Sequence, residues 1–502
     1  MKEEDIRMIQ QLVTKLFTKQ DVRQTLSTLR QEIRETGKRE ELLELMASHT
    51  EELCQLLKSE DAKTRKNAAL LMGDLGSSVY LDAIWNGYKA EQQRFARSAY
   101  LTALKGFGYE KYLTEMAEQL DELRKLNLTL ENRKHIEGEM RVLSELILAK
   151  QEIEMHKFRG FDRSVDCVFL CSRTHPEVTE EQIREIDPDA DIRPLPAGLR
   201  VRTEQLDNLM EIRTYSELLF IVPGMATCPL DPQEAAEKIA ASRILAFLMD
   251  GHEGDCPFYF RLDLKSKMQL DKKSAFAKKM ASALEQCTNH QLINSTSHYE
   301  LEIRLIENKS GEFNTLVRLC TIPDNRFAYR KEHIAASIKP VNAALLVALA
   351  QEDMIPDGQI LDPFCGVGTM LIERQKLVKG NTSYGIDVLE EAIEKAKINT
   401  EAADNIIHYI NKDFFHFTHD YLFDEIFTNM PFAMGRKTED EIFDIYEKFF
   451  RHARTVLRED GKIILYTNDR FFVWELAGEY GYHILKEYEI TQKVPTHLFV
   501  LQ

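Results

Sequence analysis

Four polar residues each follow a short apolar segment in the last third of the chain, and their side chains suit the recognition of a polar ligand. They are Asp362, Asp387, Asp413 and Asn429. Carboxylate and amide oxygens accept hydrogen bonds from hydroxyl and amino groups, so a row of such residues could orient a ligand that carries these donors. Four of them at four consecutive segment ends are hard to obtain by chance, and they indicate one shared site.

The loop after Asp362 contains two glycines. In the stretch LDPFCGVGTM (361–370), Gly366 and Gly368 would let the backbone come close to a ligand, beside the N-terminus of the following helix. An ordinary strand-to-helix turn would look the same, so the loop alone leaves both interpretations open. The loop lacks the third glycine of G-x-G-x-x-G and the chain contains no G-K-[ST], which disfavours a nicotinamide site and a P-loop.

The elements that would position these residues alternate between strand and helix over 336–502. The expected strands contain QILDPF, SYGIDV, HYINKDFF, DEIFTNMPF and KIILYTND, and the expected helices contain TMLIERQKLV, LEEAIEKAKINTEA and 439–458. This alternation predicts an α/β, Rossmann-like domain with a doubly wound parallel sheet. Ligands bind such sheets at the carboxyl ends of the strands, which is where the four polar residues are expected.

The spacing of the three aspartates resembles that of class I S-adenosylmethionine-dependent methyltransferases. The resemblance implies S-adenosylmethionine as the cofactor, with the first loop around its methionine moiety, Asp387 on the ribose hydroxyls and Asp413 near the adenine amine. The cofactor-binding residues expected on this basis are Asp362, Phe364, Cys365, Gly366, Gly368, Thr369, Asp387, Val388, Asp413 and Phe414. The alternatives are that Asp387 caps a helix and that Asp413 is a simple turn residue.

The segment TNMPFAMGRK (428–437) resembles the [N/D]-x-P-[F/Y] element of methyltransferases that modify exocyclic or amide nitrogens. The resemblance implies that the Asn429 side chain and the Met430 carbonyl accept hydrogen bonds from the target nitrogen. Pro431 belongs to the same catalytic element, and Phe432 would stack on the target base. Two cations that follow, Arg436 and Lys437, would hold neighbouring phosphates. Position 430 is more often proline and position 433, here alanine, is often glycine, so this element departs from the usual pattern.

The middle of the chain, 156–335, mixes strand-like and helical segments and carries a local cluster of cations. Between Arg261 and Lys279 there are seven basic residues and two aspartates, a net charge of +5 in a chain of −17. Such a cluster is a candidate phosphate-binding surface, and the alternative is a solvated helix face. The residues expected to contact phosphates are Lys265, Lys267, Lys272 and Lys273.

Three segments upstream of the catalytic domain resemble RNA guanosine-N2 methyltransferases that carry a THUMP module. They are 209–224, 260–284 and 326–350, and the last includes the turn Ile338-Lys339-Pro340. The resemblance implies an α+β region with a ferredoxin-like part and a THUMP part that binds structured RNA, commonly the end of the tRNA acceptor stem. RNA, most naturally tRNA, is therefore the expected partner.

The first 155 residues have the pattern of an all-α repeat region. The segments 61–76 and 92–108 are related by an offset of 32, which aligns Arg65 with Arg97 and Gly76 with Gly108. This pattern resembles HEAT-type helical repeats, and an irregular helical bundle is the alternative. The region carries no evident chemistry, so we expect it to bind a protein partner.

Bulk composition fits a multidomain protein without a membrane segment. The chain has 502 residues, 44% of them hydrophobic and 29% charged, and it contains no apolar run near 18 residues. The eight cysteines are scattered, no metal site is expected, and free thiols without an export signal favour the cytoplasm. The function predicted is formation of N2-methylguanosine in tRNA. The alternatives are methylation of DNA adenine or protein glutamine, and an inactive RNA-binding scaffold.

Overall fold

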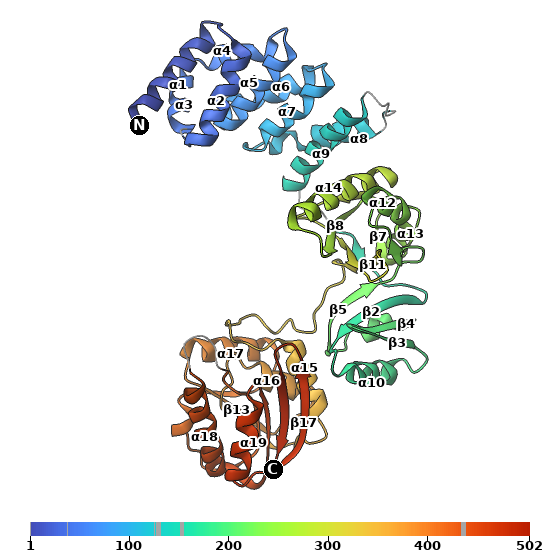
Figure 1. Ribbon diagram of the computed structural model, residues 1–502, viewed down its shortest axis with the longest axis vertical. Helices are drawn as coiled ribbons and strands as arrows, with labels where there is room; N and C mark the ends of the chain where they lie inside the picture. Colours follow the sequence, from blue (N-terminus) through green and yellow to red (C-terminus); the bar gives the residue numbers. More distant parts are fainter. Residues whose placement is uncertain (1, 38, 125, 127–131, 151–154, 433–437) are drawn as a thin grey trace. The chain divides into compact units, whose positions relative to one another are not determined.

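The computed structural model describes residues 2–37, 39–124, 126, 132–150, 155–432 and 438–502 (Figure 1). The chain divides into two compact units, Met1–Met155 and His156–Gln502. The described residues of the first unit form helices and no strand, whereas the second unit contains all the described strands. No helix among the described residues is long and apolar enough to cross a membrane.

The first unit is built from helices that pack against adjacent helices and against helices further along the chain. Helix α5 packs against α2 and α7, and α7 packs against α9. Its elements are α1 (Lys2–Phe17), α2 (Val22–Thr36), α3 (Arg39–Ala47), α4 (Thr50–Gln55), η1 (Leu56–Lys58), α5 (Ala62–Leu75), η2 (Ser78–Tyr80), α6 (Leu81–Ala90), α7 (Arg94–Leu104), η3 (Glu110–Tyr112), α8 (Leu113–Arg124) and α9 (Arg133–Lys150).

Arg65 and Arg97, which the offset of 32 aligns, make equivalent contacts. Arg65 donates to the carbonyl of Ser59 at 2.7 Å, and Arg97 donates to the carbonyl of Glu91 at 2.9 Å, six residues earlier in each case. Each guanidinium also pairs with a buried carboxylate at 2.6 Å, Arg65 with Glu91 and Arg97 with Glu139. The two segments therefore share a structural role as well as a sequence pattern.

The two aligned glycines, by contrast, are not equivalent. Gly76 caps α5 with a φ of 66°, in the left-handed region, and its N–H donates to the Met72 carbonyl. Helix α7 ends at Leu104, four residues before Gly108, which has no positive φ. The offset of 32 therefore does not extend to the helix ends, because α7 ends before its aligned glycine whereas α5 is capped by Gly76.

The first part of the second unit is a mixed sheet of two halves. Strands β2, β4 and β5 are antiparallel in one half, while β8 pairs in parallel with β9 and β10 in the other. The halves join where Phe220 of β5 pairs with Val317 of β11. The elements are β1 (Lys157–Phe158), β2 (Val165–Cys171), α10 (Pro176–Ile186), β3 (Asp191–Leu195), β4 (Gly198–Thr203), α11 (Leu206–Leu209), β5 (Tyr215–Phe220), β6 (Thr227–Cys228), α12 (Pro232–Ala240), α13 (Ile244–Gly251), β7 (His252–Glu253), β8 (Phe258–Lys265), α14 (Leu270–Cys287), β9 (Leu292–Asn294), β10 (Leu301–Glu307) and β11 (Phe313–Leu319).

The last part of the chain forms a seven-stranded sheet in the order β14-β13-β12-β15-β16-β18-β17. The first five strands in this order, from β14 to β16, run parallel to one another. Strand β18 is antiparallel to both of its neighbours, β16 and β17. The elements are α15 (Pro340–Ala350), β12 (Gln359–Asp362), α16 (Thr369–Leu377), β13 (Thr382–Asp387), α17 (Glu390–Ala402), β14 (His408–Asn411), η4 (Phe414–His416), β15 (Phe423–Asn429), α18 (Glu439–Val456), β16 (Leu457–Thr467), α19 (Arg470–Glu479), β17 (Ile484–Thr491) and β18 (Thr496–Leu501).

Both faces of this sheet are covered by helices, because the strands place apolar residues on both sides. Within β16, Ile463 and Leu465 belong to a core with α18 and α19, whereas Ile464 belongs to a core with α15 and α16. This alternation follows from the two-residue repeat of a strand. The predicted doubly wound α/β architecture is confirmed, but the sheet is not purely parallel as predicted, because β18 is antiparallel to β16 and β17.

The strand order reverses between β12 and β15. The chain proceeds from β12 outward through β13 to β14 and then returns to β15 on the other side of β12. In open α/β sheets ligands bind in the crevice outside the carboxyl ends of the strands at such a switch point. Asp362 ends β12 and Asn429 ends β15, so two of the four polar residues flank this crevice.

Candidate active site

Asp362 is a buried carboxyl group at the carboxyl end of β12. Its side chain is fully buried, and Oδ1 accepts hydrogen bonds from the Thr428 hydroxyl at 2.6 Å and the Phe364 N–H at 3.1 Å. The other oxygen, Oδ2, has no hydrogen-bond partner among the described residues. Burial raises the pKa of Asp362 to about 7, although both hydrogen bonds favour the ionised form.

Asp387 ties the glycine loop to the end of the neighbouring strand. One carboxylate oxygen accepts the N–H of Gly366 and the other accepts the N–H of Leu389, each at 2.9 Å. Gly366 has a φ of 51°, and a Cβ placed there would meet no atom within 4 Å, so the loop faces open space at this point. Each carboxylate oxygen keeps a lone pair for a further donor. The helix-capping and ligand-binding interpretations of Asp387 are therefore compatible.

Gly368 cannot be replaced without displacing Tyr409. Gly368 has a φ of 81°, and its Cβ would lie 2.2 Å from the Tyr409 hydroxyl, which is itself 2.7 Å from the Thr400 hydroxyl. Cys365 lies beneath the same loop, where a Cβ on Gly385 would approach its sulfur to 2.9 Å. Burial raises the pKa of the Cys365 thiol well above its usual range, so this residue supports the loop as a neutral packed side chain.

Further buried polar atoms near the strand ends have no hydrogen-bond partner within the described part of the chain, and three of them are candidate cofactor or substrate contacts. They belong to Thr369 (Oγ1), Asn429 (Oδ1) and Asn468 (Oδ1). Buried polar groups are nearly always hydrogen-bonded in folded proteins, so a cluster of unpaired ones indicates a site for a polar ligand. Together with Oδ2 of Asp362 they fit a cofactor rich in hydroxyl and amino groups.

The remaining predicted cofactor residues occupy different environments. Asp413 caps the short helix η4, and its Oδ1 accepts the Phe415 N–H at 2.9 Å. Val388 is exposed, whereas Phe414 is almost fully buried and packs against Phe364. Phe414 therefore supports the wall of the crevice from within the core. Asp413 has the local geometry of a turn residue, because its side chain caps η4.

The substrate motif continues from β15 with its backbone held by β16. Asn429 pairs with Tyr466, and the Met430 N–H donates to the Tyr466 carbonyl at 2.9 Å. The Met430 side chain is buried, Pro431 is half-buried, and the ring of Phe432 lies 6.0 Å from that of Tyr466. Proline has no N–H, so methionine at 430 gains a backbone hydrogen bond that the commoner residue could not make. Ala433, Arg436 and Lys437 lie outside the described residues.

The four predicted phosphate-binding lysines lie between β8 and the first turn of α14. Lys265, Lys267 and Lys272 are exposed and Lys273 is half-buried. Lys265 lies 2.9 Å from Asp263, so its charge is partly balanced. These lysines lie in one short segment of the chain, on other elements than those that form the strand-end crevice.

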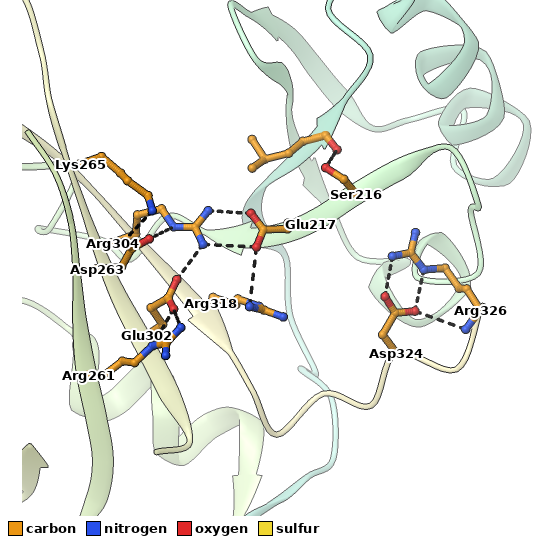
Figure 2. A network of polar contacts seen from close by, with 11 residues as sticks. Ser216, Glu217, Arg261, Asp263, Lys265, Glu302, Arg304, Arg318, Asp324 and Arg326 are labelled. Carbon is orange, nitrogen blue, oxygen red and sulfur yellow. Dashed lines mark hydrogen bonds and ion pairs between the residues drawn. The ribbon is translucent and has the colours of Figure 1, made fainter. Parts of the chain in front are cut away.

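Arg261, which contributes to the positive charge of this segment in the sequence, is already paired. Its guanidinium contacts Glu302, as Figure 2 shows, and its cation lies 4.2 Å above the ring of Tyr299. Glu302 also accepts from Arg304 at 2.7 Å, and Arg304 reaches Glu217 of β5 at the same distance. This network links the two halves of the mixed sheet, so Arg261 serves the fold.

Sequence reasoning missed two polar residues of the crevice. Thr428 precedes Asn429 and binds Asp362, but an internal threonine of an apolar strand carries no distinguishing signal. Asn468 directly follows the β16 strand, at the same carboxyl edge of the sheet as the other residues. Applying the strand-end rule to the fifth strand would have identified Asn468.

Comparisons with known proteins agree with this geometry. Residues 328–493 match the protein family described as RMKL-like, methyltransferase domain. An uncharacterized RNA methyltransferase of Streptococcus mutans is 34% identical over 107 residues, which are 20% of this chain and 23% of that relative. The chain therefore spans under a quarter of the length of this curated relative.

Two solved structures share the fold of the second unit. TrmN from Thermus thermophilus matches with a TM-score of 0.50 and 18% identity, covering 68% of this chain and 99% of its own. SMU.472, a candidate methyltransferase solved in complex with SAH, matches with a TM-score of 0.53 and 14% identity, covering 67% and 98%. Residues 328–493 are thus similar to methyltransferase domains of the RMKL-like type.

Proposed function

We propose that the protein is an RNA methyltransferase that forms N2-methylguanosine in tRNA. The observation that carries this proposal is the side-chain oxygen of Asn429, which is buried at the switch-point crevice without a hydrogen-bond partner among the described residues. The oxygen lies on the strand adjacent to the one that ends in Asp362. An unpaired acceptor at this place suits an N–H donor on the substrate.

The chemistry requires positioning more than proton abstraction. The lone pair of an exocyclic amine is delocalised into the base, so the nitrogen is a poor nucleophile. Hydrogen bonds from its N–H groups to the Asn429 oxygen and the Met430 carbonyl would favour pyramidal geometry and aim the lone pair. Phe432 would hold the base by stacking, with Pro431 fixing the backbone between them. When bound, S-adenosylmethionine supplies an electrophilic methyl group.

The cofactor would be held by the residues that form the crevice edge. Asp387 has one lone pair left on each oxygen for the ribose hydroxyls, after its bonds to Gly366 and Leu389. Asp413 would accept from the adenine amine, and Asp362 would face the cationic end of the methionine moiety. The open space beside Gly366 leaves room for a ligand against the backbone.

RNA is the substrate class that the middle region favours. Its exposed lysines at 265, 267 and 272 could contact phosphates, and we assign the mixed sheet to a ferredoxin-like part followed by a THUMP module on the resemblance of the sequence. The named relative is described as an RNA methyltransferase. We assign the first unit to a protein partner and the protein to the cytoplasm.

Mass spectrometry of nucleosides from a deletion strain tests this proposal. We expect tRNA from the deletion strain to lose N2-methylguanosine, and a wild-type copy to restore it. Asn429→Ala should fail to restore it while binding S-adenosylmethionine within a few-fold of wild type, with turnover reduced about 100-fold or more. Unchanged nucleosides in both tRNA and rRNA, with methyl transfer to DNA or protein instead, would refute the RNA assignment.

A further inference from the structure

Helix α19 exposes two aromatic side chains beside the catalytic edge of the sheet. The chain contains 26 phenylalanines and two tryptophans, and all of them lie within the described residues. Only Phe471 and Trp474 are exposed, with 79% and 56% of the residue accessible. Because every other Phe and Trp is at least partly covered, this pair is exceptional within the molecule.

The fold presents these two rings outward on one side of the helix. Val473 and Leu476 are buried against the sheet, and Phe472 packs edge-to-face against Phe443. Phe471 and Trp474 are three residues apart, so they are neighbours on the opposite surface. The packing of the helix therefore fixes both exposed rings in place.

Trp474 is further held by polar contacts that leave its ring accessible. Its indole N–H donates to Glu487 at 3.1 Å, and the guanidinium of Arg470 lies 5.1 Å from its ring centre. Arg470 itself pairs with Glu487 at 2.6 Å. The ring is thus already oriented before a ligand binds, so the side chain loses less conformational entropy on binding.

This platform lies close to the strand ends that form the crevice. Phe471 is five residues after Tyr466, the residue that pairs with Asn429, so their Cα atoms are at most about 17 Å apart. Asn468, with its unpaired buried oxygen, lies between them in the chain. A strand of RNA that presents one nucleotide to Asn429 could reach the platform with its neighbours.

The chemistry of the patch selects for nucleobases. Aromatic faces bind unpaired bases by stacking, and this interaction tolerates any base. The charge of Arg470 is balanced by Glu487, and Glu475 and Glu479 are exposed on the same helix, so recognition at this patch would depend on the ring faces and not on contacts to phosphate. Two rings are also far smaller than the roughly 800 Å² that a stable protein partner covers.

We propose that Phe471 and Trp474 form a stacking platform for unpaired nucleotides next to the target nucleotide of the RNA substrate. This inference rests on the proposed function, since it assigns a second contact surface for the same substrate. It places substrate recognition on both sides of the crevice, with Phe432 at the target base and α19 at its neighbours.

The two tryptophans provide a direct assay. Trp85 is almost fully buried in the first unit, whereas Trp474 is exposed, so a Trp85→Phe protein reports on Trp474 alone. Its fluorescence would be titrated with unfractionated tRNA from a deletion strain and with a short single-stranded oligoadenylate. Anisotropy of end-labelled RNA measures binding independently in the protein with both tryptophans.

We expect saturable quenching of Trp474 by both RNAs, at the affinity given by anisotropy. Replacing both platform residues with leucine should weaken binding of the oligoadenylate about tenfold or more, because leucine keeps the apolar surface and removes the ring face. Phe471→Tyr with Trp474→Phe should restore most of the affinity. Leu485→Ala, which changes an exposed apolar residue of β17, is the matched control.

RNA binding without quenching, or equal affinity in the leucine variant, would overturn the platform while leaving the methyltransferase assignment intact. Absence of any RNA binding by a protein that still binds S-adenosylmethionine would overturn both the platform and the RNA substrate. Unchanged S-adenosylmethionine affinity in the leucine variant shows that the cofactor site has not been disturbed.

Discussion

The carboxyl group of Asp362 should make cofactor binding depend on pH near neutrality. Burial raises its pKa to about 7, so about half of the molecules carry a protonated, neutral Asp362 at that pH. The methionine end of S-adenosylmethionine carries a sulfonium and an ammonium charge, which an ionised carboxylate attracts. Binding should therefore favour the ionised form and release a proton from the protein.

The size of this effect follows from the pKa. If the cofactor binds only the ionised form, the apparent dissociation constant is about tenfold larger at pH 6 than at pH 8, or about 1.4 kcal/mol. Binding should thus strengthen as the pH rises through about 7 and level off above about pH 8. The direction is set by the raised pKa, because protonation competes with the cofactor.

Titration calorimetry across this pH range, in buffers of different ionisation enthalpy, measures both affinity and proton release. Asp362→Asn keeps an acceptor for Thr428 and the Phe364 N–H but cannot ionise, so we expect weak binding without pH dependence. Asp413→Asn is the control and should retain the slope. Equal wild-type affinity at pH 6 and pH 8, or a persistent slope in Asp362→Asn, would refute this reasoning.

Further predictions concern the neighbouring residues. Asp387→Ala should weaken cofactor affinity about tenfold or more, because it leaves ribose hydroxyls and the Gly366 N–H unpaired, and calorimetry measures this loss. Gly368→Ala should cost about 1–3 kcal/mol in unfolding free energy, partly recovered by Tyr409→Phe, which removes the clashing hydroxyl. Alanine at all four predicted phosphate-binding lysines should flatten the salt dependence of tRNA binding in filter assays, by about 0.7 to 0.9 per lost phosphate contact. The four are Lys265, Lys267, Lys272 and Lys273. Equal slopes would assign them to the solvated surface.

The alternation of strand and helix and the polar strand ends could be predicted because both are local features of the sequence. Each of these strands has a short apolar run near its carboxyl end, and the carboxylate or amide residue that follows within two positions marks that end. Asp362, Asp387 and Asn429 stand at the last residue of β12, β13 and β15. Their meeting at one edge follows from parallel strands alone, without knowledge of the strand order.

The partners of individual side chains could not be predicted, because they depend on contacts distant in sequence. Thr428 meets Asp362 across 66 residues, and Arg261 meets Glu302 across 41. The first contact completes the site, and the second removes a cation from the proposed RNA surface. The role of Met430 is also hidden in the sequence, since its N–H bond exists only because β16 lies beside β15.

Glu373 connects the middle region of the second unit to the helix that follows the cofactor loop. Arg213 donates to both of its carboxylate oxygens, at 2.7 and 2.9 Å, and the Tyr329 hydroxyl donates to it at 2.6 Å. Glu373 is buried, so losing either partner would leave a charge poorly compensated. Glu373 lies in α16, one turn after Thr369 at the start of that helix. One rigid helix therefore holds the glycine loop at its first turn and the middle region at its next. Methyl transfer to a weak nucleophile depends on how accurately the nucleophile is positioned. Contacts to α16 would therefore help to hold an RNA bound at the lysines in register with the site of transfer.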